Sequence, residues 1–174
     1  MFISIKQTLC ILLFLFTAPF AVAQKIAVIN IDKAAIESDY AQGEIKNLLE
    51  SDGYKKQVEA YKGLRAEVEA LQKEGKANEL TWSEDQNKEQ LNKIRSRVNQ
   101  LQTLGGEIEN AKSVVNRRLL KELTPKLKKI INDMILEKKL DLLLNAQAAH
   151  YVAPGSDLTK ELTERLNKLE SAKQ

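Results

Sequence analysis

Cysteine and histidine are almost absent from this 174-residue chain. The one cysteine, Cys10, lies in an apolar run near the N-terminus, and no small-residue cleavage site that would mark it for lipid attachment precedes it. The rest of the chain therefore has no disulfide, no thiolate metal site and no cysteine nucleophile. The one histidine, His150, lacks the neighbours that a metal site or catalytic triad needs, and there is no Gly-rich phosphate loop. The sequence predicts a protein that is not an enzyme and has no metal or cofactor.

Residues 1–23 have the features of a secretory signal peptide. Lys6 supplies a positive charge, Leu9–Phe16 is unbroken apolar sequence, and Ala21-Val22-Ala23 matches the small-x-small cleavage pattern. Cleavage would leave Gln24 as the mature N-terminus of an exported protein. The alternative, an uncleaved membrane anchor, is disfavoured because the apolar run is shorter than the ~20 residues that a spanning helix needs.

Large aromatic residues are also scarce. All four phenylalanines lie within the first 23 residues, and beyond them the chain has five aromatics: Tyr40, Tyr54, Tyr61, Trp82 and Tyr151. Few aromatics with abundant Leu, Ala, Glu, Lys and Gln favour long, thin helices over a thick globular core. The 26 bases and 24 acids that remain give a net charge of +2, which does not indicate a nucleic-acid partner.

From about Tyr40 a helical pattern continues for nearly a hundred residues, which predicts a coiled coil or hairpin. Apolar residues recur at spacings of three and four on either side of Glu74–Asp85, where the pattern stops and Ser83 precedes Gln86 as a capping box. We therefore expect an antiparallel hairpin whose facing residues have numbers that sum to 159, which pairs Tyr61 with Val98. A continuous helix that dimerises with itself is the alternative.

The two ends of the chain predict a small α+β body. Strands are expected at Lys25–Asn30, Leu140–Asn145 and His150–Ala153, followed by an amphipathic helix that Asp157 or Thr159 would cap. Pro125 is expected to bend or break the ascending helix. The fold class is thus α+β but predominantly helical, with a body of residues 24–40 and 119–174 and an arm of residues 41–118. Because three short strands are marginal alone, we expect oligomerisation.

This order of parts resembles the Skp/OmpH family of periplasmic chaperones. The specific matches are the KIAVIN strand at its start and the block LDLLLNAQAAHYVAPGSDLT with the helix that follows it. The resemblance implies a homotrimer whose strands form a central β-barrel and whose three helical arms enclose a cavity. It also implies ATP-independent holding of unfolded outer-membrane proteins in the periplasm, with no catalytic residues. A structural or adaptor coiled coil of the cell envelope is the competing interpretation.

The charge distribution departs from the strongly basic arms of that family. Residues 44–116 hold 12 bases and 13 acids, whereas residues 117–139 hold eight bases and three acids. This departure argues against a lipopolysaccharide site or a membrane surface as a partner of the arm tip.

Three sets of residues are candidates for function. Side chains available for weak contacts with clients are Leu49, Leu80, Trp82 and Leu104; Trp82 has the alternative role of pinning the turn. A basic patch that would steer acidic clients, or would be only a solvated helix face, consists of Arg117, Arg118, Lys121, Lys126, Lys128 and Lys129. A hinge, or a place of close helix approach, is expected where the predicted register sets Gly53 opposite Gly106, with Gly105 adjacent.

Overall fold

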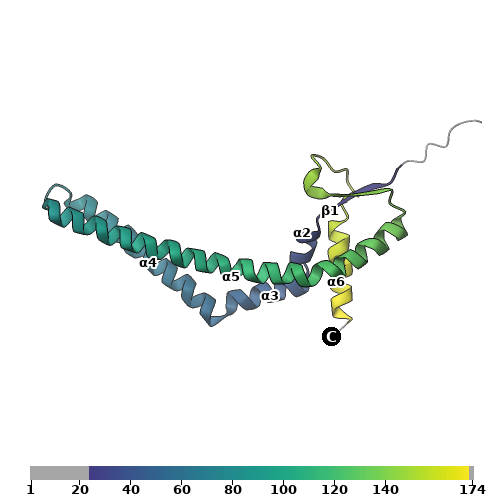
Figure 1. Ribbon diagram of the computed structural model, residues 1–174, viewed down its shortest axis with the longest axis horizontal. Coiled ribbons are helices and arrows are strands. Elements are labelled where there is room, and N and C mark those ends of the chain that lie inside the picture. Colours follow the sequence, from purple (N-terminus) through teal and green to yellow (C-terminus); the bar gives the residue numbers. More distant parts are fainter. Residues whose placement is uncertain (1–23, 173–174) are drawn as a thin grey trace, which may run out of the picture.

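The computed structural model describes residues 24–172, so the expected signal peptide lies outside the described residues. Figure 1 shows a long two-layered arm that extends from a small body, and both ends of the described chain lie in the body. The fold is α+β and predominantly helical, as the sequence predicts. None of the helices within residues 24–172 combines the length and apolar character needed to cross a membrane.

The body begins with two parallel strands from distant parts of the chain. Strand β1 (Ile26–Ile29) pairs with β2 (Leu142–Asn145), with Ile26 opposite Leu142. Helix α2 (Ile31–Ile36) follows β1 directly, and the side-chain oxygen of Asn30 caps it by accepting a 2.9 Å hydrogen bond from the Lys33 amide. The short apolar strand is thus turned at once into a helix that packs on the core.

The descending half of the arm is two helices, α3 (Asp39–Glu50) and α4 (Asp52–Asn78). Ser51 separates them with an extended ψ of 140° and caps α4, because its hydroxyl accepts from the Tyr54 amide. Figure 1 shows the two helices meeting at a sharp angle that points away from the ascending helix. The sequence analysis missed this break, although a serine followed by Asp52 and Gly53 is a helix-start signal.

The ascending half is a single helix, α5 (Glu84–Lys138), whose 55 residues span about 80 Å. Both hydrogen bonds of the expected Ser83–Gln86 capping box are present. Pro125 lies inside this helix without breaking it, so of the two predicted effects, a bend or a break, the break does not occur. The helix changes direction near its body end in Figure 1 but stays continuous because Leu123 and Leu127, on either side of the proline, are both fully buried.

The hairpin is antiparallel, but its register differs from the predicted one. Contacts across the arm join Leu71 to Gln90, Glu67 to Arg97 and Tyr61 to Gly105, so facing numbers sum to between 161 and 166. The predicted sum of 159 was wrong because the reversal between Asn78 and Glu84 is centred on Thr81, later than expected. Apolar residues at spacings of three and four, which form the seam between the two helices, would also pair with one another in neighbouring registers. The pattern alone therefore did not fix the pairing.

The register also corrects the expected glycine pair. Gly53 lies in the first turn of α4 and not opposite Gly106, and neither glycine has a neighbour near its missing Cβ. A Cβ on Gly105 would lie 3.2 Å from Cε2 of Tyr61, so this glycine permits close helix approach. The expected opposition of Gly53 and Gly106 is therefore wrong, and bending at Gly105–Gly106 stays a prediction.

The C-terminal part contains one strand fewer than expected. After β2 come a 3₁₀ turn (Ala146–Ala148), an irregular segment and helix α6 (Thr159–Ser171). His150–Ala153 is not a strand; instead the Val28 amide donates to the Ser156 carbonyl and the Leu158 amide donates to the Val28 carbonyl. The second edge of β1 is thus occupied by the residues after Pro154-Gly155, which corrects the predicted third strand.

The core of the body lies where α5 crosses α2 and α6. Its apolar side chains come from β1, α2, α5 and α6, and Figure 1 shows α6 crossing the body end of α5. The largest apolar side chains that are completely buried are Leu119, Leu123, Leu127, Met134, Leu162 and Leu166. Each such leucine contributes about 1.5–3 kcal/mol when it leaves water, so this cluster is the main source of the stability of the body.

The two adjacent glycines of α5 give a matched test of the register. Replacing Gly106 by Ala should raise the free energy of unfolding by about 0.5–1 kcal/mol, since nothing obstructs a Cβ there and alanine is the better helix former. Replacing Gly105 by Ala should raise the free energy of unfolding by less, or lower it, because the added methyl group would contact the Tyr61 ring. Chemical denaturation measures both variants, and equal stabilisation by the two would contradict the register.

Candidate functional site

Three hollows lie along the arm, and each is lined by one of the leucines expected to contact clients. The tip hollow, of about 870 Å³, includes Leu80. The middle hollow, of about 450 Å³, includes Leu104 and lies on α5 alone. The root hollow, of about 330 Å³, includes Leu49 and lies beside the break between α3 and α4. The structure therefore does not gather the candidate leucines into one site but spreads them from root to tip.

Trp82 lies in the turn at the tip and is half-buried. Its amide donates to the Asn78 carbonyl at 2.9 Å, and its own carbonyl accepts from Asn87 Nδ2 at 3.4 Å. Leu80, two residues earlier, is fully exposed. Both bonds use backbone atoms of Trp82, so the role of its side chain stays a prediction, and Leu80 is an apolar side chain that the tip presents to solvent.

The candidate basic patch is not a single surface. Arg117 donates to the Ser113 hydroxyl at 2.8 Å, and Arg118 forms an ion pair with Glu44. Lys126 points the other way, into the body: its Nζ is 2.8 Å from a Glu170 oxygen and 5.7 Å from the centre of the Tyr40 ring. The hydrogen bond to Glu170 raises the pKa of Lys126.

The exposed remainder of the patch forms a stripe on one face of α5. Arg117, Lys121 and Lys128 are separated by four and seven residues, which places them on the same side of a helix. Lys129 lies beside them and is also exposed. Of the six candidate bases, Lys126 acts in the packing of the body and the exposed Arg118 is paired with Glu44, so this stripe holds the bases that remain available to a partner.

An ion-pair cluster that sequence reasoning missed clamps α6 to the end of α5. Arg165 of α6 lies 2.6 Å from a carboxylate oxygen of Glu137 and 2.9 Å from Oε1 of Glu161. The other carboxylate oxygen of Glu161, Oε2, lies 2.9 Å from Nζ of Lys138. Hydrogen bonds from Arg165 and Lys138 lower the pKa of Glu137 and of Glu161, respectively. Only the spacing of Glu161 and Arg165, four residues apart, was visible in the sequence.

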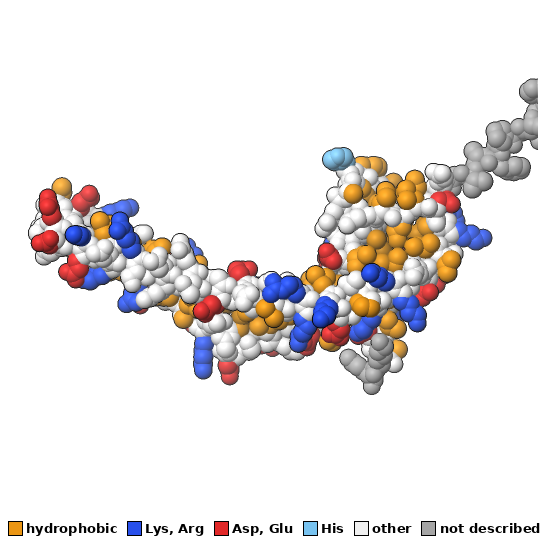
Figure 2. Space-filling view, in the orientation of Figure 1, with side chains coloured by type: hydrophobic (Ala, Val, Ile, Leu, Met, Phe, Trp, Pro, Cys, Tyr) orange, Lys and Arg blue, Asp and Glu red, His pale blue; other side chains and the backbone are white. Residues whose placement is uncertain are grey.

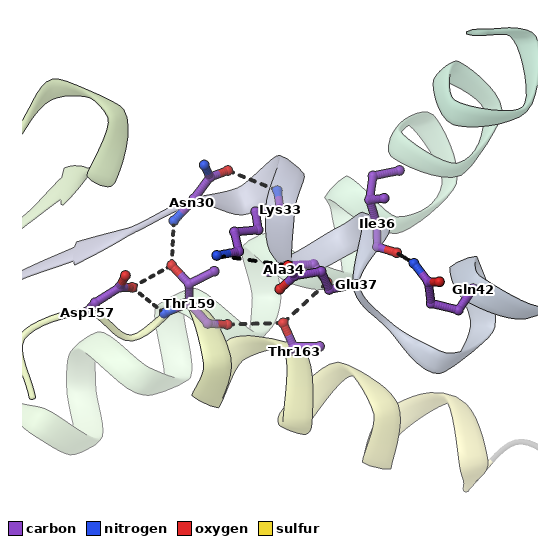
Figure 3. Close-up of polar contacts among 9 residues, drawn as sticks. All are labelled: Asn30, Lys33, Ala34, Ile36, Glu37, Gln42, Asp157, Thr159 and Thr163. Atoms are coloured by element: carbon purple, nitrogen blue, oxygen red, sulfur yellow. Dashed lines mark hydrogen bonds and ion pairs between the residues drawn. The ribbon is translucent and has the colours of Figure 1, made fainter. Parts of the chain in front are cut away.

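A second polar network joins the two ends of the chain at the start of α6 (Figure 3). The Thr159 hydroxyl accepts a 2.9 Å hydrogen bond from the Asn30 amide and donates to Asp157 Oδ1 at 2.5 Å. Asp157 also accepts from the Thr159 amide at 2.8 Å, and these two bonds lower its pKa. Thr163, one turn later, reaches the Ala34 carbonyl at 3.4 Å. The N-cap position of α6 is Leu158, which makes no side-chain capping bond, so the prediction that Asp157 or Thr159 is the cap was wrong. Thr159 and Thr163 instead tie α6 to Asn30 at the end of β1 and to α2.

An apolar face of the sheet was also missed from the sequence. Ile26, Leu142 and Leu144 are each more than 40% exposed, and the in-register pairing of their strands places them on one face, opposite Ala27 and Leu143. Figure 2 shows apolar side chains gathered over the body, while charged side chains of both signs are scattered along the arm. Within residues 24–172 no strand pairs with the outer edge of β2.

The part of the chain that the structure describes contains no group of three or more His, Cys, Asp or Glu side chains that would hold a metal ion. His150 is exposed in the segment after the 3₁₀ turn.

The architecture and its surfaces define a class of protein: an α+β body that carries one helical-hairpin arm and presents scattered apolar patches. The chain belongs to the family described as outer membrane protein (OmpH-like), whose sequence model matches residues 25–166. It is 30% identical over 154 residues to a Skp-like protein of Pseudomonas aeruginosa, a match that covers 87% of this chain and 90% of the relative. A crystal structure of an OmpH-like protein from Caulobacter crescentus shares 18% identity, with a TM-score of 0.45 and coverage of 84% and 85% of the two chains.

The clamp between α5 and α6 predicts a specific dependence of stability on acidity. The pKa of Glu161 in the folded protein lies below its usual 4.5, so its contribution is present above that value and is lost as the pH falls through the lowered pKa. Replacing Glu161 by Gln should lower Tm at pH 7 and reduce the loss of Tm between pH 5 and pH 3.

Glu164→Gln is the matched control, because Glu164 is exposed and only 3.9 Å from Lys160 across a single turn. This control should change little in Tm at pH 7 or in the loss of Tm between pH 5 and pH 3. Circular dichroism melts at the three pH values measure both variants. The same acid dependence in Glu161→Gln as in the parent protein would argue against the clamp.

Proposed function

We propose that this protein is an ATP-independent holdase that binds unfolded outer-membrane β-barrel proteins in the periplasm and keeps them from aggregating. It works as a homotrimer whose arms surround the client. It performs no catalysis, and its arm does not depend on lipopolysaccharide or on a membrane surface. Export would follow cleavage after residue 23, before Gln24.

The observation that carries the proposal is the distribution of apolar contact points along the arm of a member of the OmpH-like family. A holdase needs many weak contacts, because a single tight site would trap the client, and exposed apolar patches on a soluble surface mark interaction sites. Leu49, Leu80 and Leu104 are spread over the whole arm, each in a separate hollow. This arrangement favours a flexible polypeptide as the partner over a compact one.

The exposed face and edge of the sheet in the body support the trimer. A two-stranded sheet is marginal alone, and here its outer face carries Ile26, Leu142 and Leu144 next to an unpaired edge of β2. Unpaired edges with apolar neighbours are covered in stable proteins, most simply by another chain. Pairing of sheets from copies of this chain would cover both the edge and the apolar face.

The alternative of an adaptor coiled coil is separated from the holdase by a client assay. An unfolded β-barrel membrane protein diluted from urea should stay soluble with the protein and precipitate without it. Because the arm is nearly neutral, with 12 bases and 13 acids in residues 44–116, retention should change little between 20 and 150 mM salt. Light scattering at both salt concentrations is the measurement. Failure to suppress aggregation would refute the holdase, and a steep loss with salt would show charge-dominated binding.

The trimer predicts that a charge on the exposed sheet face dissociates the protein. Leu144→Asp should reduce the mass measured by light scattering at micromolar concentration from three chains to one. Leu80→Asp is the control, since Leu80 is fully exposed at the tip of the arm, far from the sheet, and should leave the mass unchanged. A parent protein that is monomeric at this concentration would contradict the proposal.

A further inference from the structure

The tip hollow is the largest of the three in the arm, at about 870 Å³, and nine residues from both helices and the turn line it. Its apolar members are Leu80, Leu91 and Ile94. Leu80 is fully exposed and Leu91 is 54% exposed. This apolar surface at the far end of a thin arm does not contribute to the core of the body, so its exposure is not explained by folding.

Uncharged polar groups border the apolar part of the hollow. Gln72 of α4 and Asn87 of α5 belong to the lining, and Gln90 contributes an amide whose Nε2 donates to the Leu71 carbonyl at 2.9 Å and to Glu74 Oε2 at 3.1 Å. These two bonds use both donors of Gln90 and leave its amide oxygen as the remaining acceptor. Side-chain amides both donate and accept, which is the capacity needed to pair with the backbone of a chain that lacks secondary structure.

We propose that the tip hollow is a subsite for an extended, uncharged segment of the client in which apolar side chains alternate with polar ones. The alternate apolar side chains pack on Leu80, Leu91 and Ile94, and the bordering amides pair with the free backbone groups between them. This inference rests on the proposed function and specifies the sequence pattern that the tip of the arm recognises in a client.

The dimensions of the hollow favour an extended segment over a helix. Its lining on α4 runs from Gln72 to Lys76 and continues to Leu80 in the turn, which corresponds to about 12 Å of helix. An extended chain covers that length with about four residues and leaves its backbone groups open to the amides. A helix of the same length has about two turns, and most of its backbone groups are already paired internally.

A second copy of the chain is not the occupant. The hollow offers nine residues, whereas stable protein interfaces use about 20–30 residues on each side. Charge gives a further constraint: Lys76 and Glu79 are the charged residues of the lining and have opposite signs. A near-neutral lining favours a near-neutral segment, because a charged one would lose hydration without a compensating partner.

The single tryptophan of the chain lies next to this hollow, outside its lining. Trp82 is in the turn, and its carbonyl accepts from Asn87, a residue of the lining. The probe is a tryptophan-free peptide of ten residues with blocked ends and alternating Leu and Thr. Binding should shift the emission of Trp82, and the anisotropy of a labelled copy of the peptide gives the Kd.

Leu80→Ser combined with Leu91→Ser should weaken the peptide at least fivefold and abolish the emission shift. Leu136→Ser should change neither, since Leu136 lies on the body end of α5 and its exposure, 76%, falls between those of Leu80 and Leu91. A peptide of the same composition with leucines at helical spacing should bind at least fivefold more weakly than the alternating one. Because the replaced leucines are exposed, the variants should keep their helical circular dichroism.

Unchanged peptide affinity in the double variant, or equal binding of the helical-pattern peptide, would overturn the inference. The same preparations are tested for suppression of β-barrel aggregation. If the parent protein suppresses aggregation but binds neither peptide at the tip, the subsite is wrong and the holdase stands. If it binds the alternating peptide at Trp82 but does not suppress aggregation, the subsite stands as a peptide site and the holdase is wrong.

Discussion

The structure depends on the burial of one apolar stripe of α5 in the body. Leu119, Leu123 and Leu127 lie on this stripe, and together with Leu162 and Leu166 of α6 they are completely buried. The same helix continues for 35 residues before Leu119 as the ascending side of the arm. Arm and body are therefore not separate units joined by a linker, and the direction of the arm is set by how this stripe packs.

This anchoring explains why the arm can present apolar side chains without collapsing. The clamp of Arg165 with Glu137 and Glu161 holds α6 against the end of α5, and the Thr159 network holds it against β1 and α2. Such partly exposed ion pairs contribute modestly to stability, so their effect is to orient elements that the apolar core has already joined. The arm itself has only a narrow seam, and its remaining surface is open to a partner.

Sequence reasoning recovered the features that follow from local chemistry. The capping box at Ser83, the antiparallel hairpin and the family resemblance needed only spacing and residue type. The register was wrong because a repeating seam matches itself in several registers, and the break at Ser51 was missed because the apolar pattern continues across it. Pro125 was expected to bend or break α5, and the helix stays continuous because core packing on both sides outweighs the missing amide. The ion-pair clamp and the apolar sheet face depend on residues far apart in the chain, which periodicity does not bring together.

Residue-resolved hydrogen exchange of the intact protein tests most directly whether arm and body share one continuous helix. The account predicts that amides from Leu119 to Met134 exchange last and as one unit, on both sides of Pro125. Protection should then decrease steadily along α5 toward Glu84 at the tip. Fast exchange at Lys126–Lys129, comparable to that at the tip, would show that the helix is divided at the proline and would contradict the account.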